Sequence, residues 1–296
     1  MRRAELKGDK LVIVRLLALF ILILPLAAVG QGVALHDDDA LVKRALTNEV
    51  RAAEDQRHPM RYCLHKSSPR LTSTKEIFET KDGAVARLIA VNDSPLSAGD
   101  EEKEHTRLAT LLSDPEQQHH RKETQDEDTA RAMKILRALP NAFLYEFAGT
   151  GTGPKRAVLK FTFKPNPKFD SPDLETQLLM QMTGEIWIDV AQERVVRLEG
   201  HLTRDANLAW GILARLNKGG WILIEQADVG DHQWRIVHFK MAMTGRVLFM
   251  AKVFDTTEDT SRFAPLPLGL SYKQAIQMAE SEDLNTSQGT SAQTNR

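Results

Sequence analysis

The stretch from Gly184 to Gly200, GEIWIDVAQERVVRLEG, decides the fold class. Ile186 and Ile188 alternate with Trp187 and with acidic residues, and Leu198 lies between two charged residues further along. A period of two residues places successive side chains on opposite faces of a strand. The stretch therefore predicts two antiparallel strands joined by a short turn, each with one face toward a core and one toward water.

Other parts of the chain repeat this pattern, with few long connections between them. Extended segments are predicted at 60–66, 71–79, 84–92, 143–147, 158–163, 186–190 and 196–202. Asp82-Gly83 supplies the positive φ that a tight hairpin needs. Three further segments are apolar on both faces and must be covered by helices or by a ligand: 211–216, 221–224 and 247–254. The sequence predicts an α+β protein built on a strongly curved antiparallel β-meander, an unclosed sheet like half a barrel.

Helices are expected at both ends of this sheet and within it. Apolar residues recur at helical spacing in 36–57, and a terminal helix is predicted at 271–281. In 99–131, fifteen of 33 residues are charged and none is aromatic. With Asp114 as N-cap and Pro115 at the first helical position, the segment 99–139 is interpreted as a charged helical pair inserted between strands, mostly exposed and with one narrow apolar edge that includes Leu108 and Leu111.

The N-terminus reads as a targeting segment. Basic residues precede an uncharged run, LLALFILILPLAAVG, at 16–30. This predicts a signal peptide over 1–30, cleaved before Gln31, and hence a periplasmic or secreted protein. The alternative is an uncleaved anchor in the inner membrane. The remainder is interpreted as a single domain over 31–281, followed by a polar, disordered tail at 282–296.

Charge and cysteine content narrow the class of partner. Lys+Arg number 39 and Asp+Glu number 40, so no chain-wide basic field attracts nucleic acid. Cys63 is the single cysteine, which excludes an internal disulfide. The sequence contains neither Gly-x-Ser-x-Gly nor His-Glu-x-x-His. The glycine-rich segment Gly149–Gly153 is not predicted to bind phosphate, because it does not precede a helix. His119 and His120 are not predicted to bind one metal ion, because adjacent residues of a helix point in different directions. No catalytic residue, metal ligand or cofactor is predicted.

Four tryptophans are the one unusual concentration of side chains. Trp187, Trp210, Trp221 and Trp234 all fall within the predicted strand region. Ordinary β packing accounts for such a set. The alternative is that the four partly line an apolar cavity beneath the helices, which makes them the candidate ligand-binding residues.

The motif Gly184-Glu-Ile-Trp-Ile-Asp189, followed by Arg194-Val-Val-Arg-Leu-Glu199-Gly200, resembles the periplasmic lipoprotein-carrier and sigma-regulator superfamily, LolA/LolB and RseB-like. The chain also resembles uncharacterised exported bacterial proteins of similar fold. The carrier resemblance covers about 36–97 and 140–281, and the charged insertion is an addition to its pattern. It implies an unclosed barrel partly covered by helices, with room for an acyl chain or apolar peptide between them.

Three hypotheses of function follow. The first is an exported, non-enzymatic protein that binds an apolar ligand such as a lipid, an acylated protein or an apolar peptide. The second is an envelope interaction or sensor module with a filled core, whose charged helical insertion contacts a protein partner. The third is a hydrolase with an unrecognised site. Lipid or lipoprotein is the expected partner under the first hypothesis.

Overall fold

Consecutive antiparallel hairpins organise the chain, as the alternating patterns predict. The computed structural model describes residues 38–152, 157–208, 214–247 and 250–281. Residues from Asp39 onward form one compact unit. The expected signal peptide and polar tail lie outside the described residues, and so does Trp210.

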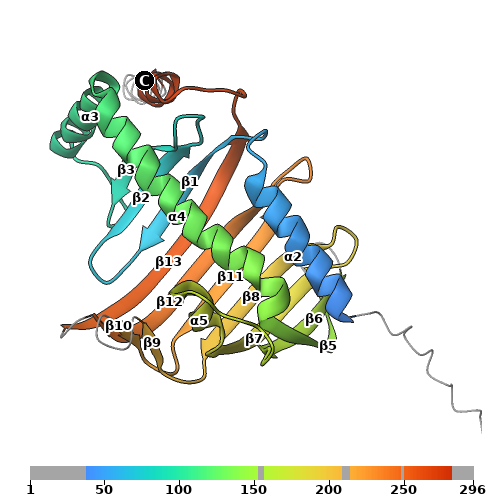
Figure 1. Cartoon of the computed structure of the whole chain (residues 1–296). Coiled ribbons are helices and arrows are strands. Elements are labelled where there is room, and N and C mark those ends of the chain that lie inside the picture. The colour runs from blue at the N-terminus through green and yellow to red at the C-terminus, as the bar shows by residue number, and fades with distance from the viewer. Residues whose placement is uncertain (1–37, 153–156, 209–213, 248–249, 282–296) are drawn as a thin grey trace, which may run out of the picture. The chain divides into compact units, whose positions relative to one another are not determined.

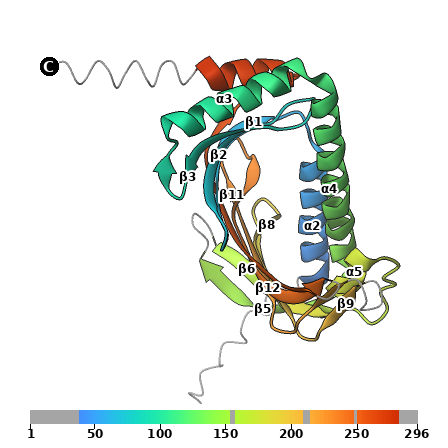
Figure 2. The same ribbon diagram turned by 90° about the vertical axis from the view of Figure 1, so that its left-hand side faces the viewer.

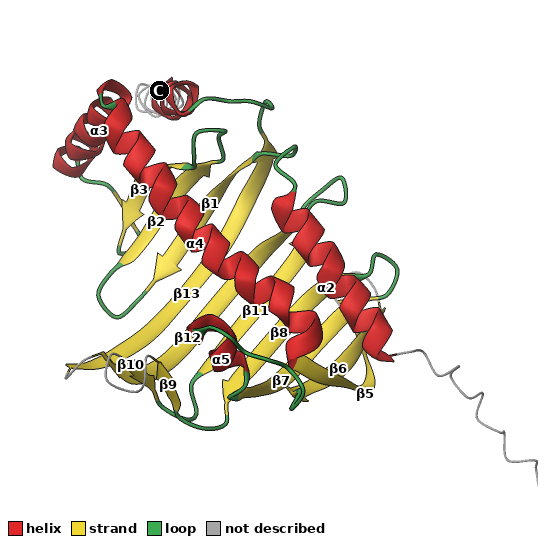
Figure 3. Cartoon of the chain, in the orientation of Figure 1, coloured by secondary structure: helices red, strands yellow, loops and turns green. Residues whose placement is uncertain are grey.

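The strands and helices alternate in blocks along the chain (Figure 3). The strands are β1 (Met60–Ser67), β2 (Thr72–Phe78), β3 (Val85–Val91), β4 (Ser94–Pro95), β5 (Phe143–Thr152), β6 (Ala157–Pro165), β7 (Met182–Asp189), β8 (Arg194–Leu202), β9 (Ala206–Leu208), β10 (Ala214–Leu216), β11 (Trp221–Asp228), β12 (Trp234–Val247) and β13 (Met250–Pro265). The helices are α2 (Asp38–Glu54), α3 (Ala98–Ser113), α4 (Pro115–Ala142), α5 (Leu174–Leu179) and a last helical stretch at 272–281.

The described strands form one sheet in the order β4-β3-β2-β1-β13-β12-β11-β8-β7-β6-β5, with β10 and β9 added beside β12. All pairings between them are antiparallel. The pairing of β1 with β13 joins the first hairpins to the last. Because β4 and β5 lie at opposite ends of this order, the sheet is not closed. The sheet curves, and α2 and α4 run along its concave side (Figures 1 and 2). The predicted α+β class with a curved, unclosed meander is confirmed.

A first hydrophobic core, called core 1, lies where α2 and the end of α4 meet β5–β8, and it extends to α5, β9 and Met243 of β12. Ile186 and Ile188 of β7 are completely buried there, together with Phe161 of β6 and Leu46 of α2. Glu49 of α2 is also buried, and its carboxylate accepts bonds from the guanidinium of Arg194 at 2.8 and 2.9 Å. The helix predicted at 36–57 thus covers one end of the sheet through an apolar stripe.

A second hydrophobic core, core 2, lies at the other end of the sheet. Phe78 and Val85 of the β2–β3 hairpin are completely buried against Leu108 and Leu111 of α3. The helical stretch 272–281 joins them with Ala275, Ile276 and Ala279. Helix α3 is mostly exposed, as predicted for the insertion, and its narrow apolar edge of Leu108 and Leu111 is buried in core 2. Because β1 pairs with β13, the helical stretch 272–281 that follows β13 lies at this end of the sheet. It packs there with the β2–β3 hairpin and α3 in core 2.

Two local features depart from the expected boundaries. The strand β5 continues to Thr152 instead of ending in a loop at Gly149, because a bulge between Phe147 and Gly149 keeps it paired with β6. Helix α4 begins as predicted, with Asp114 as N-cap and Pro115 in its first turn. It runs past Pro140 to Ala142. A proline this close to the C-terminus interrupts only the bond to the carbonyl of Leu136.

Candidate functional site

The two faces of the sheet differ in character along its middle strands. On the convex face, one row runs across six strands through Lys160, Trp187, Arg197, Glu225, His238 and Asp259. The row beside it on the concave face reads Ile186, Leu198, Ile224 and Phe239. Since Ile186 belongs to core 1, this second row faces the helices. The middle of the sheet therefore presents apolar side chains to α2 and α4.

These concave side chains are less buried than a core requires. We call five of them the apolar sheet patch: Leu198, Ile222, Ile224, Phe239 and Met241. All five are only partly buried, whereas Ile186 in the same row is completely buried. The patch lies on β8, β11 and β12. Three of its members pack against the border of core 1: Leu198, Ile222 and Met241. Ile224 and Phe239 belong to neither core, so they are the part of the patch that is left outside both.

Helix α4 gives the complementary observation. Its residues 126–132 are exposed on every side of the helix, although α4 runs along the concave side of the sheet. We call this stretch the open span. Gln125 before it is partly buried and Met133 after it is buried, so the inward stripe of the helix continues through Thr129 and Ala132. At these two residues the sheet-facing side of α4 meets solvent.

The parts of α4 before and after the open span are held by contacts with other elements. Glu54 of α2 pairs with Arg137 of α4 at 2.6 Å, which ties the two helices together. At the other end, the Gln118 amide donates to the carbonyl of Asp82 at 2.6 Å, and Gln125 both donates to and accepts from the backbone of Ala84. The open span is therefore an exposed part of α4 between two segments of the helix that are held in place.

Polar groups border the patch at the β1 side. Lys66 and Glu258 form an ion pair of 2.6 Å on the concave face, and Glu258 is the cross-strand neighbour of Phe239. Tyr62 stacks on Phe263 with ring centroids 5.4 Å apart. Burial raises the pKa of the Tyr62 phenol to about 12, so this hydroxyl stays neutral. An apolar surface bordered by a few polar groups is the usual composition of a small-molecule site.

The tryptophans predicted to line a cavity do not converge. Trp187 lies on the convex face, where the ammonium of Lys160 and the guanidinium of Arg197 contact its ring at 4.1 and 5.3 Å. Trp221 is on that same face, beneath Lys240. Trp234 is buried near Arg194 and donates its indole N–H to Gln192. Ligand binding by the four tryptophans stays a prediction, and none of the described three belongs to the apolar sheet patch.

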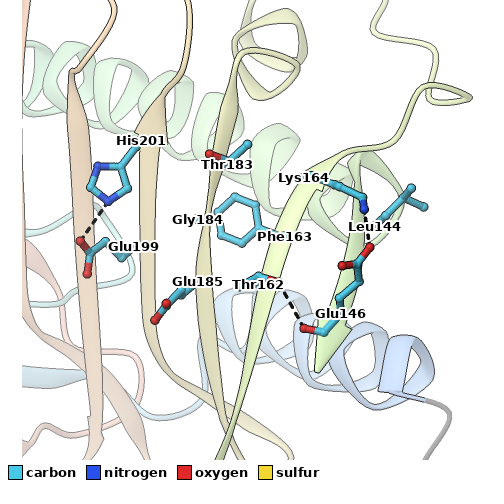
Figure 4. A pocket seen from close by; sticks show the side chains of 10 residues that line it. All are labelled: Leu144, Glu146, Thr162, Phe163, Lys164, Thr183, Gly184, Glu185, Glu199 and His201. Atoms are coloured by element: carbon cyan, nitrogen blue, oxygen red, sulfur yellow. Dashed lines mark hydrogen bonds and ion pairs between the residues drawn. The ribbon is translucent and has the colours of Figure 1, made fainter. Parts of the chain in front are cut away.

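A shallow pocket of about 470 Å³ lies on the convex side of β5–β8 (Figure 4). Its lining is mixed: Leu144, Glu146, Thr162, Phe163, Lys164, Thr183, Gly184, Glu185, Glu199 and His201. Gly184 also limits the packing on the other face of this strand, because a Cβ would lie 1.8 Å from the carbonyl oxygen of Glu199 and 2.7 Å from the ring of Phe163, which belongs to core 1. This explains the glycine that opens the motif Gly184–Asp189.

The carboxylates of this pocket already have partners. Glu146 pairs with Lys164, and His201 Nε2 lies 3.0 Å from Glu199 Oε1. A side-chain hydrogen bond from Arg197 holds the pKa of Glu199 below its ordinary value. Glu199 is thus an ionised acceptor at neutral pH and a poor general acid. Within the described ranges, no three His, Cys, Asp or Glu side chains gather closely enough to hold a metal ion.

Two other sequence features can be placed. Cys63 lies partly buried on β1 as a free thiol, and burial raises its pKa. Among the described helices, none combines the length and the apolar composition needed to cross a bilayer.

Comparison with known proteins gives a weak structural relation and nothing stronger. No family model matches the sequence, and no curated protein matches it. A solved outer membrane lipoprotein-sorting protein domain from Vibrio parahaemolyticus is 12% identical, with 79% of this chain and 98% of that chain covered and a TM-score of 0.30. MucB in complex with MucA(peri) is 12% identical over 79% and 97% of the two chains, with a TM-score of 0.21. Values this low carry no argument about function.

Proposed function

We propose that this chain is an exported, non-catalytic protein that binds an apolar ligand between the apolar sheet patch and α4. The observation that supports it most is the open span, whose inward residues Thr129 and Ala132 meet solvent. The sheet beneath it offers partly buried aliphatic and aromatic side chains. A ligand that covered them would remove apolar surface from water, worth about 25 cal/mol per Å².

The geometry favours an elongated, amphipathic ligand. Seven residues of helix span about 10 Å, which is wide enough for an acyl chain or the side chains of an apolar peptide. The open span itself is polar, with Asp126, Glu127 and Asp128 at its start. A lipid or an acylated protein would place its chain against the sheet and its polar part toward solvent. These are the ligand classes that we propose.

A matched pair of substitutions on α4 tests this proposal. Ala132 and Ala130 are both exposed, but helical geometry points Ala132 toward the sheet and Ala130 away from it. We expect A132F to fill the space and to lower the affinity of the delipidated protein for a fluorescent fatty-acid analogue at least tenfold. A130F introduces the same ring on the outer side and should leave the affinity unchanged.

Both variants should unfold within about 0.5 kcal/mol of the wild type, as surface substitutions do. If the wild type binds no probe, or if A132F and A130F behave alike, the ligand proposal fails. An interaction module with a filled core then becomes the better explanation. Mass spectrometry of the exported protein would add the N-terminal residue and any retained lipid, and an intact 1–30 segment would contradict the predicted cleavage.

A further inference from the structure

The end of the β12–β13 hairpin extends beyond its neighbour on one side. Pairing between β1 and β13 reaches Thr257, and the preceding part of β13 from Met250 to Thr256 pairs only with β12 among the described strands. On the other side, β10 adds three residues beside β12. We call these strand ends, residues 214–216, 245–247 and 250–253, the hairpin end. It lies at the end of β12 and β13 that is opposite to α3 and the C-terminal helix (Figure 1).

Apolar side chains are unusually exposed at the hairpin end. Val253 is 68% exposed and Met250 is 58% exposed, which places both among the most exposed large apolar residues of the described chain. Val253 shares the convex face with Arg246, whereas Met250 lies on the other face of the same strand. Both faces of the hairpin end thus offer apolar surface to a partner.

The charges at the hairpin end have a single sign. Its charged residues are Arg215, Arg246 and Lys252, in a chain whose net charge is −1. Arg215 and Arg246 stand directly opposite each other on β10 and β12, an arrangement of like charges that costs stability. Asp205 pairs with Arg215. Arg246 and Lys252 form no ion pair with any residue that the structure describes.

We propose that the hairpin end docks on an anionic phospholipid surface. Paired guanidinium groups are suited to phosphate, and a phosphate beside Arg246 would relieve the repulsion from Arg215. Met250 and Val253 can enter the boundary between headgroups and acyl chains, as the apolar faces of interfacial segments do. Each cation near such a surface strengthens binding about fivefold. This inference is independent of the ligand proposal, since the hairpin end and the apolar sheet patch share no residue.

A local probe tests the docking without interference from the N-terminal apolar segment. In a C63A background of the full chain, an environment-sensitive dye is attached to M250C or, as the control, to L268C. Leu268 is 72% exposed but follows the opposite end of β13, so a dye at this position lies outside the hairpin end and its cations. Vesicles contain phosphatidylcholine alone or an equal mixture with phosphatidylglycerol, and both carry a quencher in the acyl region.

We expect the dye at position 250 to shift to the blue and to be quenched on the anionic vesicles, while the dye at position 268 is unchanged. The double variant R246Q/K252Q should weaken this binding roughly 30-fold. Circular dichroism of the double variant checks that the sheet is retained. Equal signals at both dye positions, an unaltered signal in R246Q/K252Q, or equal binding to both kinds of vesicle would overturn the proposal. Full displacement by millimolar inorganic phosphate would overturn it too, because the cations would then serve a free anion.

Discussion

The two covered ends of the sheet differ in which strands their helices bond to. In core 1, Phe161, Ile186 and Ile188 are completely inaccessible, and Glu49 of α2 accepts from the N–H of Val195 at 2.9 Å on β8, a strand inside the sheet. Core 2 has its own buried side chains, and α3 bonds to the backbone of β3, next to the end of the sheet. Glu104 of α3 accepts from the Leu88 N–H at 2.8 Å, and Arg107 donates to the Ala86 carbonyl at 2.6 Å. At core 2, helix α3 therefore covers the backbone of β3 as well as the apolar face of the sheet.

This difference has a structural reason. Strand β3 is followed only by the two-residue β4, so most of its outer edge would be left with free N–H and C=O groups. Exposed edges invite pairing with other chains, and proteins cover or charge them. Glu104 and Arg107 provide such a cover. Gln118 and Gln125 do the same for the hairpin tip, where Gly83 has a φ of +92°. Between these two anchored ends the sheet can stay accessible without loss of the fold.

The largest expected effect is in core 1. Phe161 is completely buried in core 1 and packs against Phe147 with ring centroids 5.9 Å apart. Replacing it by Ala removes most of a ring and leaves a cavity, so we expect F161A to lower the free energy of unfolding by about 3–5 kcal/mol. Urea denaturation measures this. A loss below 1 kcal/mol would show that core 1 does not hold the sheet.

Sequence patterns predicted this end of the molecule well, because its information is local. The alternation of Ile186 and Ile188 with Trp187 fixes which face is buried, and the structure places Trp187 on the opposite face. The Asp114-Pro115 pair likewise marks the start of α4. Such signals depend on neighbours within a few residues.

The other end and the middle depend on contacts between distant segments, and sequence patterns predicted them only in part. The segment 221–224, which contains Ile222 and Ile224, was predicted to need cover by helices or a ligand, but the other three patch residues were not singled out. Leu108 and Leu111 were visible only as a narrow apolar edge, because nothing local shows that β1 pairs with β13. The four tryptophans are close in sequence, but strand parity and register separate the three described ones. A signal for the open span was present: residues 116–129 contain no apolar side chain, and the first large apolar residue of α4 is Met133.

An intermediate effect is expected in core 2. The Glu104 side chain is buried on α3. Burial favours its neutral form, but hydrogen bonds from Arg107 and the Leu88 N–H outweigh this and lower its pKa below the ordinary value. We expect E104Q to lose about 1–3 kcal/mol of unfolding free energy at pH 7, because a charged acceptor is replaced by a neutral amide.

The pH dependence gives this prediction its sign. A carboxylate whose pKa is lowered in the folded state stabilises the protein above its unfolded pKa, and that contribution is lost as the pH falls through the folded pKa. The difference between wild type and E104Q should therefore shrink in acid as the wild-type carboxylate becomes protonated. A difference that stays constant between pH 7 and pH 3 would mean that the ionised form of Glu104 does not hold α3 on the strand.

The smallest effect on stability, and the most informative about function, is expected in the middle of the sheet. Phe239 is only partly buried and lies on β12 beside Ile224, so F239A should cost about 1 kcal/mol, the average for point substitutions, and well below F161A. If the ligand rests on the apolar sheet patch, however, F239A should lower the affinity for the fluorescent fatty-acid analogue several-fold. W187A is the control from the convex face, where the ring contacts Lys160 and Arg197 and not the helix side. Probe titration of both variants separates the two predicted sites: reduced affinity in F239A alone supports the patch. Reduced affinity in W187A alone would support the tryptophans instead and would move the ligand to the convex face of the sheet.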